Sequence, residues 1–218
     1  MNRVASNIIT IAVAKGRILA ETLEVLAAVD IVPAVDPATS RKLIWATTGG
    51  EVRLVIIRAA DVPTYVQFGA ADLGVVGKDV LMEYGGSELY ELMDLRLAPC
   101  RMVVAEPEAL AATDDPRNWR RLRIATKYEN ITRAHFASKG IQTEIIKLYG
   151  SMELAPLAGL ADRIVDLVAS GATLRANGLV EVEHIADVSA RLVANKASMK
   201  VKSNKLKALS QRIANCIQ

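Results

Sequence analysis

The chain has 218 residues, of which 51% are hydrophobic and 23% charged, and it carries a formal net charge of +3. This length and composition predict a folded globular protein with one sizeable domain or two small ones, and they exclude an intrinsically disordered chain. Aromatic residues make up only 4% of the chain, which argues against a surface that stacks the bases of single-stranded nucleic acid.

Short apolar segments alternate with helical ones in the first part of the chain. This alternation predicts an α/β fold with largely parallel sheets. Thr48-Gly49-Gly50-Glu51 is a hairpin signal between two of the strands, and Asp61 with Pro63 marks the start of a helix. We expect strands over residues 8–14, 43–48, 52–58 and 71–77.

The alternation restarts after Pro99. Strands are expected at residues 101–105, 123–126, 143–148 and 164–168, and helices at 129–139 and 153–157. We therefore predict an α/β protein of two lobes, joined near residues 95–99, with the chain crossing back near 184–189. Lobe I comprises residues 1–97 and 185–218, lobe II comprises residues 98–184, and a ligand is expected in a cleft between them.

The segment from Asp166 to Leu174 is a candidate anion site. Residues 164–168 are apolar apart from Asp166, which suits a strand buried on both faces. Ser170-Gly171-Ala172-Thr173 follows, and consecutive backbone N–H groups in such a turn form an anion-sized concavity. A carboxylate beside this turn suggests a sugar phosphate, with its hydroxyls on Asp166 and its phosphate in the loop. An ordinary strand-to-helix turn is the alternative.

The end of the chain, from Asn195, is basic and contains no acidic residue. Leu206, Leu209, Ile213 and Ile217 fall at helical spacing, which predicts an amphipathic helix packed on the body. Its basic face is either solvated or a contact for nucleic acid, a phosphate-rich ligand or an acidic partner. The basic residues are Lys196, Lys200, Lys202, Lys205, Lys207 and Arg212.

Residues 1–7 carry one positive charge, and the apolar run that follows them breaks at Lys15. Neither a signal peptide nor a membrane span is therefore predicted. Cys100 and Cys216 form no CxxC or metal-spaced cluster, which argues against a disulfide framework or a zinc site. We expect a cytoplasmic protein that has no membrane partner and no metal held by protein ligands alone.

A longer ordered pattern surrounds the candidate anion site, and it resembles the ATP phosphoribosyltransferase family. It begins with Glu153 and Gly159, continues through Ala161 and Ile164, and ends in the segment from Asp166 to Leu174. Further motifs of the same family stand elsewhere in the expected order, so the resemblance covers essentially the whole chain. They are Lys15-Gly16-Arg17 and residues 58–63 (RAADVP), 71–79 (ADLGVVGKD), 124–128 (IATKY) and 176–179 (ANGL).

The resemblance implies a two-lobe fold like that of periplasmic binding proteins, and the first reaction of histidine biosynthesis. In that reaction N1 of ATP displaces pyrophosphate from C1 of phosphoribosyl pyrophosphate. It also implies Mg²⁺ held mainly through substrate phosphates. Because little sequence follows the basic helix, the chain is similar to the short catalytic form. That form works with a regulatory subunit similar to histidyl-tRNA synthetase, as a homodimer within a hetero-oligomer.

The resemblance assigns the 5′-phosphate to Ser170, Gly171, Ala172 and Thr173, and the ribose hydroxyls to Asp166. A carboxylate that caps the N–H groups of its own loop is the alternative for Asp166. Glu153 is expected at the ribose or the Mg²⁺ shell, or else it merely favours a helix dipole. Other phosphoribosyltransferases carry two adjacent acids before this loop, whereas Asp162 and Asp166 are four residues apart and would share one face of a strand.

The remaining candidates are basic residues and glycines at predicted strand ends. Arg58 is expected to clamp the departing pyrophosphate with its guanidinium, with Arg41 as a second catalytic candidate. Arg17 is a weaker polyphosphate candidate, and surface ion pairing explains Arg17 and Arg41 nearly as well. Nucleotide contacts are expected from Lys15, Gly16, Gly77, Lys127 and Tyr128, although a tyrosine is more often part of a core.

Three other functions compete with this interpretation. A solute-binding domain would share the fold, but it would not explain why a carboxylate, Asp166, stands beside the phosphate loop. A phosphoribosyltransferase for a free base would favour adjacent acids, and nucleic-acid binding depends only on the basic tail. His135, beside Phe136, is expected to pack or to face solvent, since adenine N1 has no proton for a histidine to remove.

Overall fold

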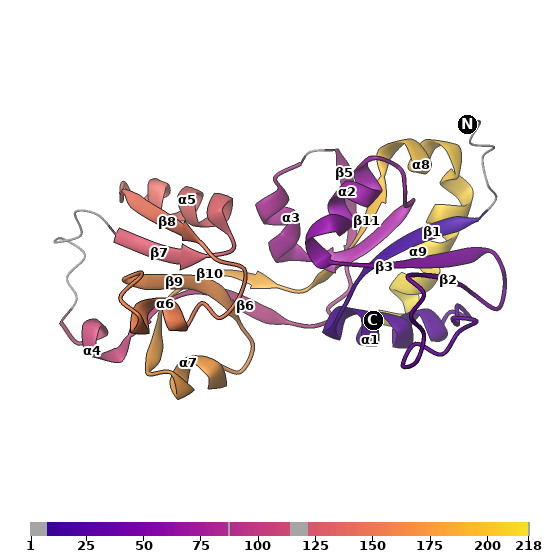
Figure 1. The fold of residues 1–218 in the computed structure, drawn as a ribbon. Coiled ribbons are helices and arrows are strands. Elements are labelled where there is room, and N and C mark those ends of the chain that lie inside the picture. The colour runs from indigo at the N-terminus through magenta and orange to yellow at the C-terminus, as the bar shows by residue number, and fades with distance from the viewer. Residues whose placement is uncertain (1–7, 87, 114–121, 218) are drawn as a thin grey trace. The chain divides into compact units, whose positions relative to one another are not determined.

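A computed structural model describes residues 8–86, 88–113 and 122–217, so the N-terminal segment 1–7 lies outside the described residues. The chain divides into two compact units (Figure 1). Unit 1 comprises Met1–Ala98 and Ser189–Gln218, and unit 2 comprises Pro99–Val188.

Unit 1 is built on a six-stranded sheet with the order β2-β3-β1-β4-β11-β5. Its centre is parallel, because β1 pairs in the same direction with β3 on one side and β4 on the other. The outer pairs are antiparallel. The strands are β1 (Ile9–Ala14), β2 (Ile44–Ala46), β3 (Val52–Ile57), β4 (Leu73–Gly77), β5 (Leu89–Asp94) and β11 (Ala190–Asn195).

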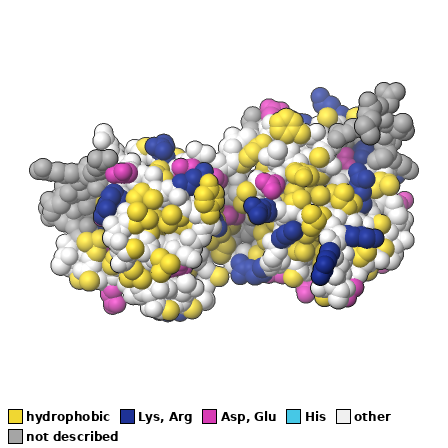
Figure 2. Space-filling view, viewed as in Figure 1, with side chains coloured by type: hydrophobic (Ala, Val, Ile, Leu, Met, Phe, Trp, Pro, Cys, Tyr) yellow, Lys and Arg dark blue, Asp and Glu magenta, His cyan; other side chains and the backbone are white. Residues whose placement is uncertain are grey.

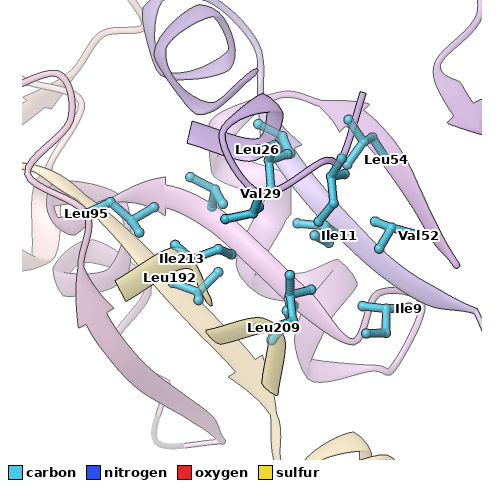
Figure 3. Close-up of a cluster of buried hydrophobic side chains, with 14 of the residues drawn as sticks. Ile9, Ile11, Leu26, Val29, Val52, Leu54, Leu95, Leu192, Leu209 and Ile213 are labelled. Carbon is cyan, nitrogen blue, oxygen red and sulfur yellow. The ribbon is translucent and has the colours of Figure 1, made fainter. Parts of the chain in front are cut away.

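Helices cover both faces of this sheet. Leu26 of α1 (Arg17–Ala27) and Leu209 and Ile213 of α9 (Ser203–Ile217) pack with Ile11 and Leu54 into the larger core (Figure 3). On the other face, Val62 and Val66 of α2 (Val62–Gln67) pack against β1, β4 and β11. The remaining elements are η1 (Ala59–Asp61), α3 (Lys78–Tyr84) and α8 (Lys196–Val201).

Unit 2 is built on a five-stranded sheet with the order β10-β6-β9-β7-β8. β9, β7 and β8 run parallel, and β6 and β10 complete the sheet in antiparallel pairs. The strands are β6 (Cys100–Pro107), β7 (Leu122–Thr126), β8 (Thr143–Lys147), β9 (Arg163–Val168) and β10 (Leu179–Val188). The helices are α4 (Glu108–Ala111), α5 (Glu129–Ser138), α6 (Leu154–Leu157) and α7 (Ala172–Ala176).

The expectation of largely parallel sheets is wrong, because both sheets are mixed. The strands that make them mixed include β5, β10 and β11, which the apolar pattern did not predict. β10 carries mostly half-buried or exposed residues and has two register irregularities, so it lacks a clear alternation. The predicted hairpin is confirmed, since β2 and β3 pair with Trp45 opposite Leu54.

The predicted amphipathic C-terminal helix is confirmed as α9, with Leu206, Leu209 and Ile213 buried. Several basic residues of the tail have partners in unit 1. Lys202 pairs with Asp72 at 2.8 Å and Lys196 with Glu88 at 3.5 Å. In Figure 2 the Lys and Arg side chains on the visible face stand apart, with other side chains between them. None of the described helices is long and apolar enough to cross a bilayer.

Candidate active site

A pocket of about 250 Å³ lies where β9 ends in unit 2. β9, β7 and β8 are parallel neighbours, so their carboxyl ends meet at one edge of the sheet, the usual place for a ligand in such sheets. The pocket is lined by Glu153 and by every residue from Asp166 to Leu174. The structure therefore brings together the carboxylates and the loop that the sequence singled out.

The loop from Ser170 to Thr173 turns at Gly171, whose φ of 73° lies in the left-handed region. A Cβ on Gly171 would stand only 2.9 Å from Nη1 of Arg175 and 3.3 Å from Oε1 of Glu181. Glycine therefore suits both the backbone conformation and the space. The side chains of Ser170 and Thr173 are exposed, and Ser170 Oγ accepts a hydrogen bond from the backbone N–H of Ala172 at 3.3 Å.

Asp166 and Glu153 supply two half-buried carboxylates to the pocket. Asp166 Oδ1 accepts a hydrogen bond of 2.8 Å from the N–H of Leu167, the next residue. Glu153 precedes the four-residue α6, and in the described structure its side chain makes no capping hydrogen bond there. Both carboxylates line one pocket with the loop, an arrangement that suits a ligand carrying hydroxyls and a phosphate.

Asp162 lies outside β9, which contains Asp166. It precedes the first residue of β9, and its carboxylate binds Arg123, with Nη2 to Oδ1 at 2.8 Å and the backbone N–H to Oδ2 at 2.9 Å. Burial alone would raise the pKa of Asp162, but these hydrogen bonds outweigh it and lower that pKa. Asp162 is absent from the pocket lining, so its role is structural.

Lys127 and Tyr128 follow β7, next to β9 in the sheet. The Lys127 side chain is exposed, and its Nζ lies 4.7 Å from the centre of the Tyr128 ring. Tyr128 is only 2% exposed, and its N–H donates to Thr126 Oγ1 at 2.9 Å. A ring this covered has no free face for a base, so the structure favours the packing interpretation of Tyr128.

An arginine–carboxylate pair that the sequence did not reveal lies beside the loop. Arg101 of β6 donates from Nε to Oε2 of Glu181 at 2.8 Å and from Nη2 to Oε1. Its remaining nitrogen, Nη1, donates to the carbonyl oxygen of Ala169 at 3.0 Å. Eighty positions separate Arg101 from Glu181, and no local pattern links residues so far apart.

The second group of predicted residues lies in unit 1. β3, β1 and β4 are parallel neighbours, so Arg58, Lys15-Gly16 and Gly77 stand at the same edge of the sheet. The N–H of Lys15 donates to the carbonyl of Ile57 at 2.9 Å, which joins two of these strand ends. Gly16 has a φ of 93°, which favours glycine.

Arg41 approaches the same edge. β2 runs antiparallel to β3, and the carbonyl of Leu43 accepts from the N–H of Ile56 at 2.8 Å, so the chain enters β2 near the end of β3. Arg58 and Arg41 are both exposed. Arg17, in contrast, has a hydrogen-bond partner within unit 1, because its Nη2 donates to the carbonyl of Ala98 at 3.2 Å. The structure thus favours a structural role for Arg17.

His135 lies outside the pocket lining. Its ring packs edge-on against Phe136 with centroids 5.2 Å apart, as the sequence suggested. Burial, and to a lesser extent the charge of Lys139, lowers the pKa of His135.

A larger hollow of about 470 Å³ lies at the opposite edge of the unit 1 sheet, beside Ile9 and Val52 at the starts of β1 and β3. It contains none of the predicted site residues, and its arginine, Arg212, already donates to the carbonyl of Val29. We therefore keep two groups of candidate residues, one at the strand ends of each unit.

Comparison with known proteins gives a consistent result. The sequence profile of a family described as ATP phosphoribosyltransferase matches residues 58–215. An ATP phosphoribosyltransferase of Acidithiobacillus ferrooxidans is 60% identical over 94% of this chain and 95% of its own length.

Two solved structures extend this comparison. The ATP phosphoribosyl transferase (HisG:HisZ) complex from Thermotoga maritima matches with a TM-score of 0.83 and 32% identity, over 96% of this chain and 98% of that one. The periplasmic aliphatic sulphonate binding protein SsuA of Escherichia coli matches with a TM-score of 0.61 at 12% identity, over 95% of this chain and 72% of that one. The second likeness concerns the fold alone, and it confirms the expected resemblance to periplasmic binding proteins.

Proposed function

The chain belongs to the ATP phosphoribosyltransferase family, and on this premise we propose how its residues carry out the reaction. The reaction transfers the phosphoribosyl group of phosphoribosyl pyrophosphate to N1 of ATP and releases pyrophosphate, as the first step of histidine biosynthesis. The observation that carries the proposal is the unit 2 pocket, in which Glu153, Asp166 and the loop from Ser170 to Thr173 line one space.

The loop binds the 5′-phosphate of the donor. Ser170 and Thr173 contribute hydroxyls, and Gly171 and Ala172 leave the backbone N–H groups unshielded by large side chains. A phosphate oxygen accepts hydrogen bonds from such groups in a turn. The exposed side chains of Ser170 and Thr173 and the left-handed turn at Gly171 support this assignment.

Asp166 binds the ribose hydroxyls, and Glu153 assists it. A carboxylate accepts hydrogen bonds from vicinal hydroxyls, and both side chains line the pocket that contains the loop. The ribose carbon C1 gains positive character as its bond to pyrophosphate breaks, and nearby carboxylates stabilise that charge. The bond from C1 to adenine N1 forms at the same carbon, and no proton has to be removed from N1.

Arg58 stabilises the departing pyrophosphate, with Arg41 in support. Negative charge grows on the leaving group in the transition state, and a guanidinium binds two phosphate oxygens at once. Arg58 is exposed directly after β3, whose end lies beside that of β1, with β4 on the far side of β1. Lys15, Gly16 and Gly77 at this edge contact the nucleotide, and so does Lys127 of unit 2. Arg17 and Tyr128 are weaker candidates because both are engaged elsewhere.

Mg²⁺ is the proposed cofactor, held mainly through substrate phosphates. Among the described residues, no group of three or more His, Cys, Asp or Glu side chains is arranged to hold a metal. The donor set nevertheless fits, since Mg²⁺ commonly uses one or two carboxylates together with phosphate oxygens, and Glu153 and Asp166 offer two. When bound, the ion neutralises charge on the pyrophosphate.

A regulatory subunit similar to histidyl-tRNA synthetase is the proposed partner, with this chain as a homodimer in the hetero-oligomer. The support is the similarity to the chain of the HisG:HisZ complex over nearly its whole length. We further propose a cytoplasmic enzyme without nucleic-acid or membrane partners. In support of the absence of a nucleic-acid partner, three of the six basic residues of the tail, Lys196, Lys202 and Arg212, are paired within unit 1.

Product formation tests the proposed function. Purified protein mixed with ATP, phosphoribosyl pyrophosphate and Mg²⁺ should form phosphoribosyl-ATP, which chromatography with mass detection identifies. A solute-binding protein of the same fold would bind the donor and return it unchanged. Absence of product, both alone and with the regulatory subunit, would reject the proposal.

A further inference from the structure

Arg101 is connected to the phosphate loop through the backbone. It lies on β6 directly opposite Val168, the last residue of β9. Its Nη1 donates to the carbonyl oxygen of Ala169 at 3.0 Å, while Nε and Nη2 are both bound by Glu181 of β10. One guanidinium therefore joins three strands of the unit 2 sheet at the point where the loop begins.

The hydrogen bond from Arg101 to the carbonyl of Ala169 orients the whole peptide group between Ala169 and Ser170. The carbonyl of Ala169 and the N–H of Ser170 belong to the same peptide plane, and in a trans peptide they point in opposite directions. Holding this carbonyl on Arg101 therefore holds the Ser170 N–H pointing away from Arg101. Ala169 and Ser170 both line the pocket, so the orientation of this plane sets the direction of the first N–H donor of the loop.

Glu181 in turn fixes the guanidinium. Two hydrogen bonds to one carboxylate define the plane and the rotation of an arginine head group. Glu181 Oε1 also lies 3.3 Å from the position that a Cβ on Gly171 would occupy. The pair thus borders the turn itself.

We propose that Arg101 and Glu181 are positioning residues, which orient the Ala169–Ser170 peptide plane so that the loop can bind the 5′-phosphate of phosphoribosyl pyrophosphate. The inference rests on the proposed function of the loop. It assigns no contact between Arg101 and the substrate.

Two other roles make different predictions. A plain surface ion pair contributes little, so its loss would leave donor binding unchanged. An Arg101 that touched the phosphate directly would be weakened by the opposing charge of Glu181, and removal of Glu181 would then tighten binding. Under the positioning role, removal of Glu181 weakens binding even though it removes a negative charge near an anion site.

The test measures the binding of phosphoribosyl pyrophosphate and of ATP, each by calorimetry, to the full chain and its variants. Arg101→Gln should weaken donor binding about tenfold, because a lost charged hydrogen bond commonly costs such a factor. Glu181→Ala should also weaken donor binding. The double variant should bind the donor no more weakly than Arg101→Gln alone, because both changes disturb the same interaction. In steady-state assays the KM for the donor should rise while kcat and the KM for ATP stay within about twofold.

Arg123 provides a matched control within the same unit. It also pairs with a carboxylate, Asp162, and donates from Nη1 to a backbone carbonyl, that of Gly159, at 3.1 Å. Gly159 does not line the pocket, whereas Ala169, whose carbonyl Arg101 holds, does. Arg123→Gln should therefore leave donor binding unchanged.

Three outcomes would overturn the inference: unchanged donor binding in Arg101→Gln, unchanged or tighter binding in Glu181→Ala, or an equal loss in Arg123→Gln. Thr173→Val separates this inference from the proposed function. If Thr173→Val weakens donor binding and Arg101→Gln does not, the loop assignment stands and the positioning role is wrong. If Thr173→Val has no effect, the loop assignment itself is wrong.

Discussion

Asp72 and Lys202 are 130 positions apart, and the Lys202 Nζ lies 2.8 Å from Asp72 Oδ2. The same carboxylate accepts from the N–H of Thr10 at 2.8 Å and from Ser198 Oγ at 2.7 Å. Asp72 is only 7% exposed. Asp72 therefore connects the start of β1 to α8 and to the residue that precedes α9. These elements come from the two segments of unit 1, which the chain leaves after residue 98 and re-enters at residue 189.

Removal of this carboxylate should destabilise unit 1. Asp72→Ala removes the acceptor of the buried Thr10 N–H and leaves the half-buried ammonium of Lys202 with the carbonyl of Ile8 as its remaining partner. We expect a loss of about 3 kcal/mol in the free energy of unfolding, measured with urea. Lys196→Ala removes the exposed pair with Glu88 and should cost less than about 1 kcal/mol. Equal losses in the two variants would contradict the role given to Asp72.

Acid should weaken the Asp162–Arg123 pair. The folded-state pKa of Asp162 lies below its ordinary value of 3.8 because the hydrogen bonds from Arg123 outweigh the effect of burial. The contribution of the pair is therefore complete above the unfolded pKa and is lost as pH falls through the lower folded pKa. In urea titrations, Asp162→Asn should be less stable than the parent at pH 7 by a margin that shrinks at about pH 3. A margin independent of pH would contradict this prediction.

Arg58→Ala tests the role at the leaving group. If Arg58 acts mainly on the departing pyrophosphate, kcat should fall by about 10²- to 10³-fold, while the dissociation constant for ATP changes by less than about threefold. Arg53→Ala is the control. Arg53 lies on β3, the strand that Arg58 follows, but near its start, away from Arg58, and its Nε donates to Thr10 Oγ1 at 2.9 Å. Equal losses of turnover and ATP affinity in Arg58→Ala would make Arg58 a plain binding residue.

The parts of the fold that the sequence could predict are those with local causes. The parallel strands β1, β3, β4, β7 and β9 are short and largely apolar, and each leads into a helix signal or a small-residue loop. The segment 166–174 could be singled out because its members are neighbours in the sequence. The family pattern also points to Glu153, and the structure places it at the same pocket.

The remaining features depend on contacts between distant residues. β10 pairs with β6 although its inward and outward positions do not alternate cleanly, so sheet pairing rather than local pattern makes it a strand. Arg101 and Glu181 meet only because β10 and β6 are neighbours. The spacing predicts Asp162 on a strand face with Asp166, but Asp162 precedes β9 and its carboxylate is bound by Arg123, 39 positions away.

The loop from Ser170 to Thr173 is proposed to bind the 5′-phosphate of the donor, and the donor affinity of Thr173→Val is the measurement that depends on this role alone. Valine keeps the shape of the side chain and removes the hydroxyl. By calorimetry, phosphoribosyl pyrophosphate should bind about tenfold more weakly, while the dissociation constant for ATP stays unchanged. An unaltered affinity for phosphoribosyl pyrophosphate would show that this loop does not bind the 5′-phosphate.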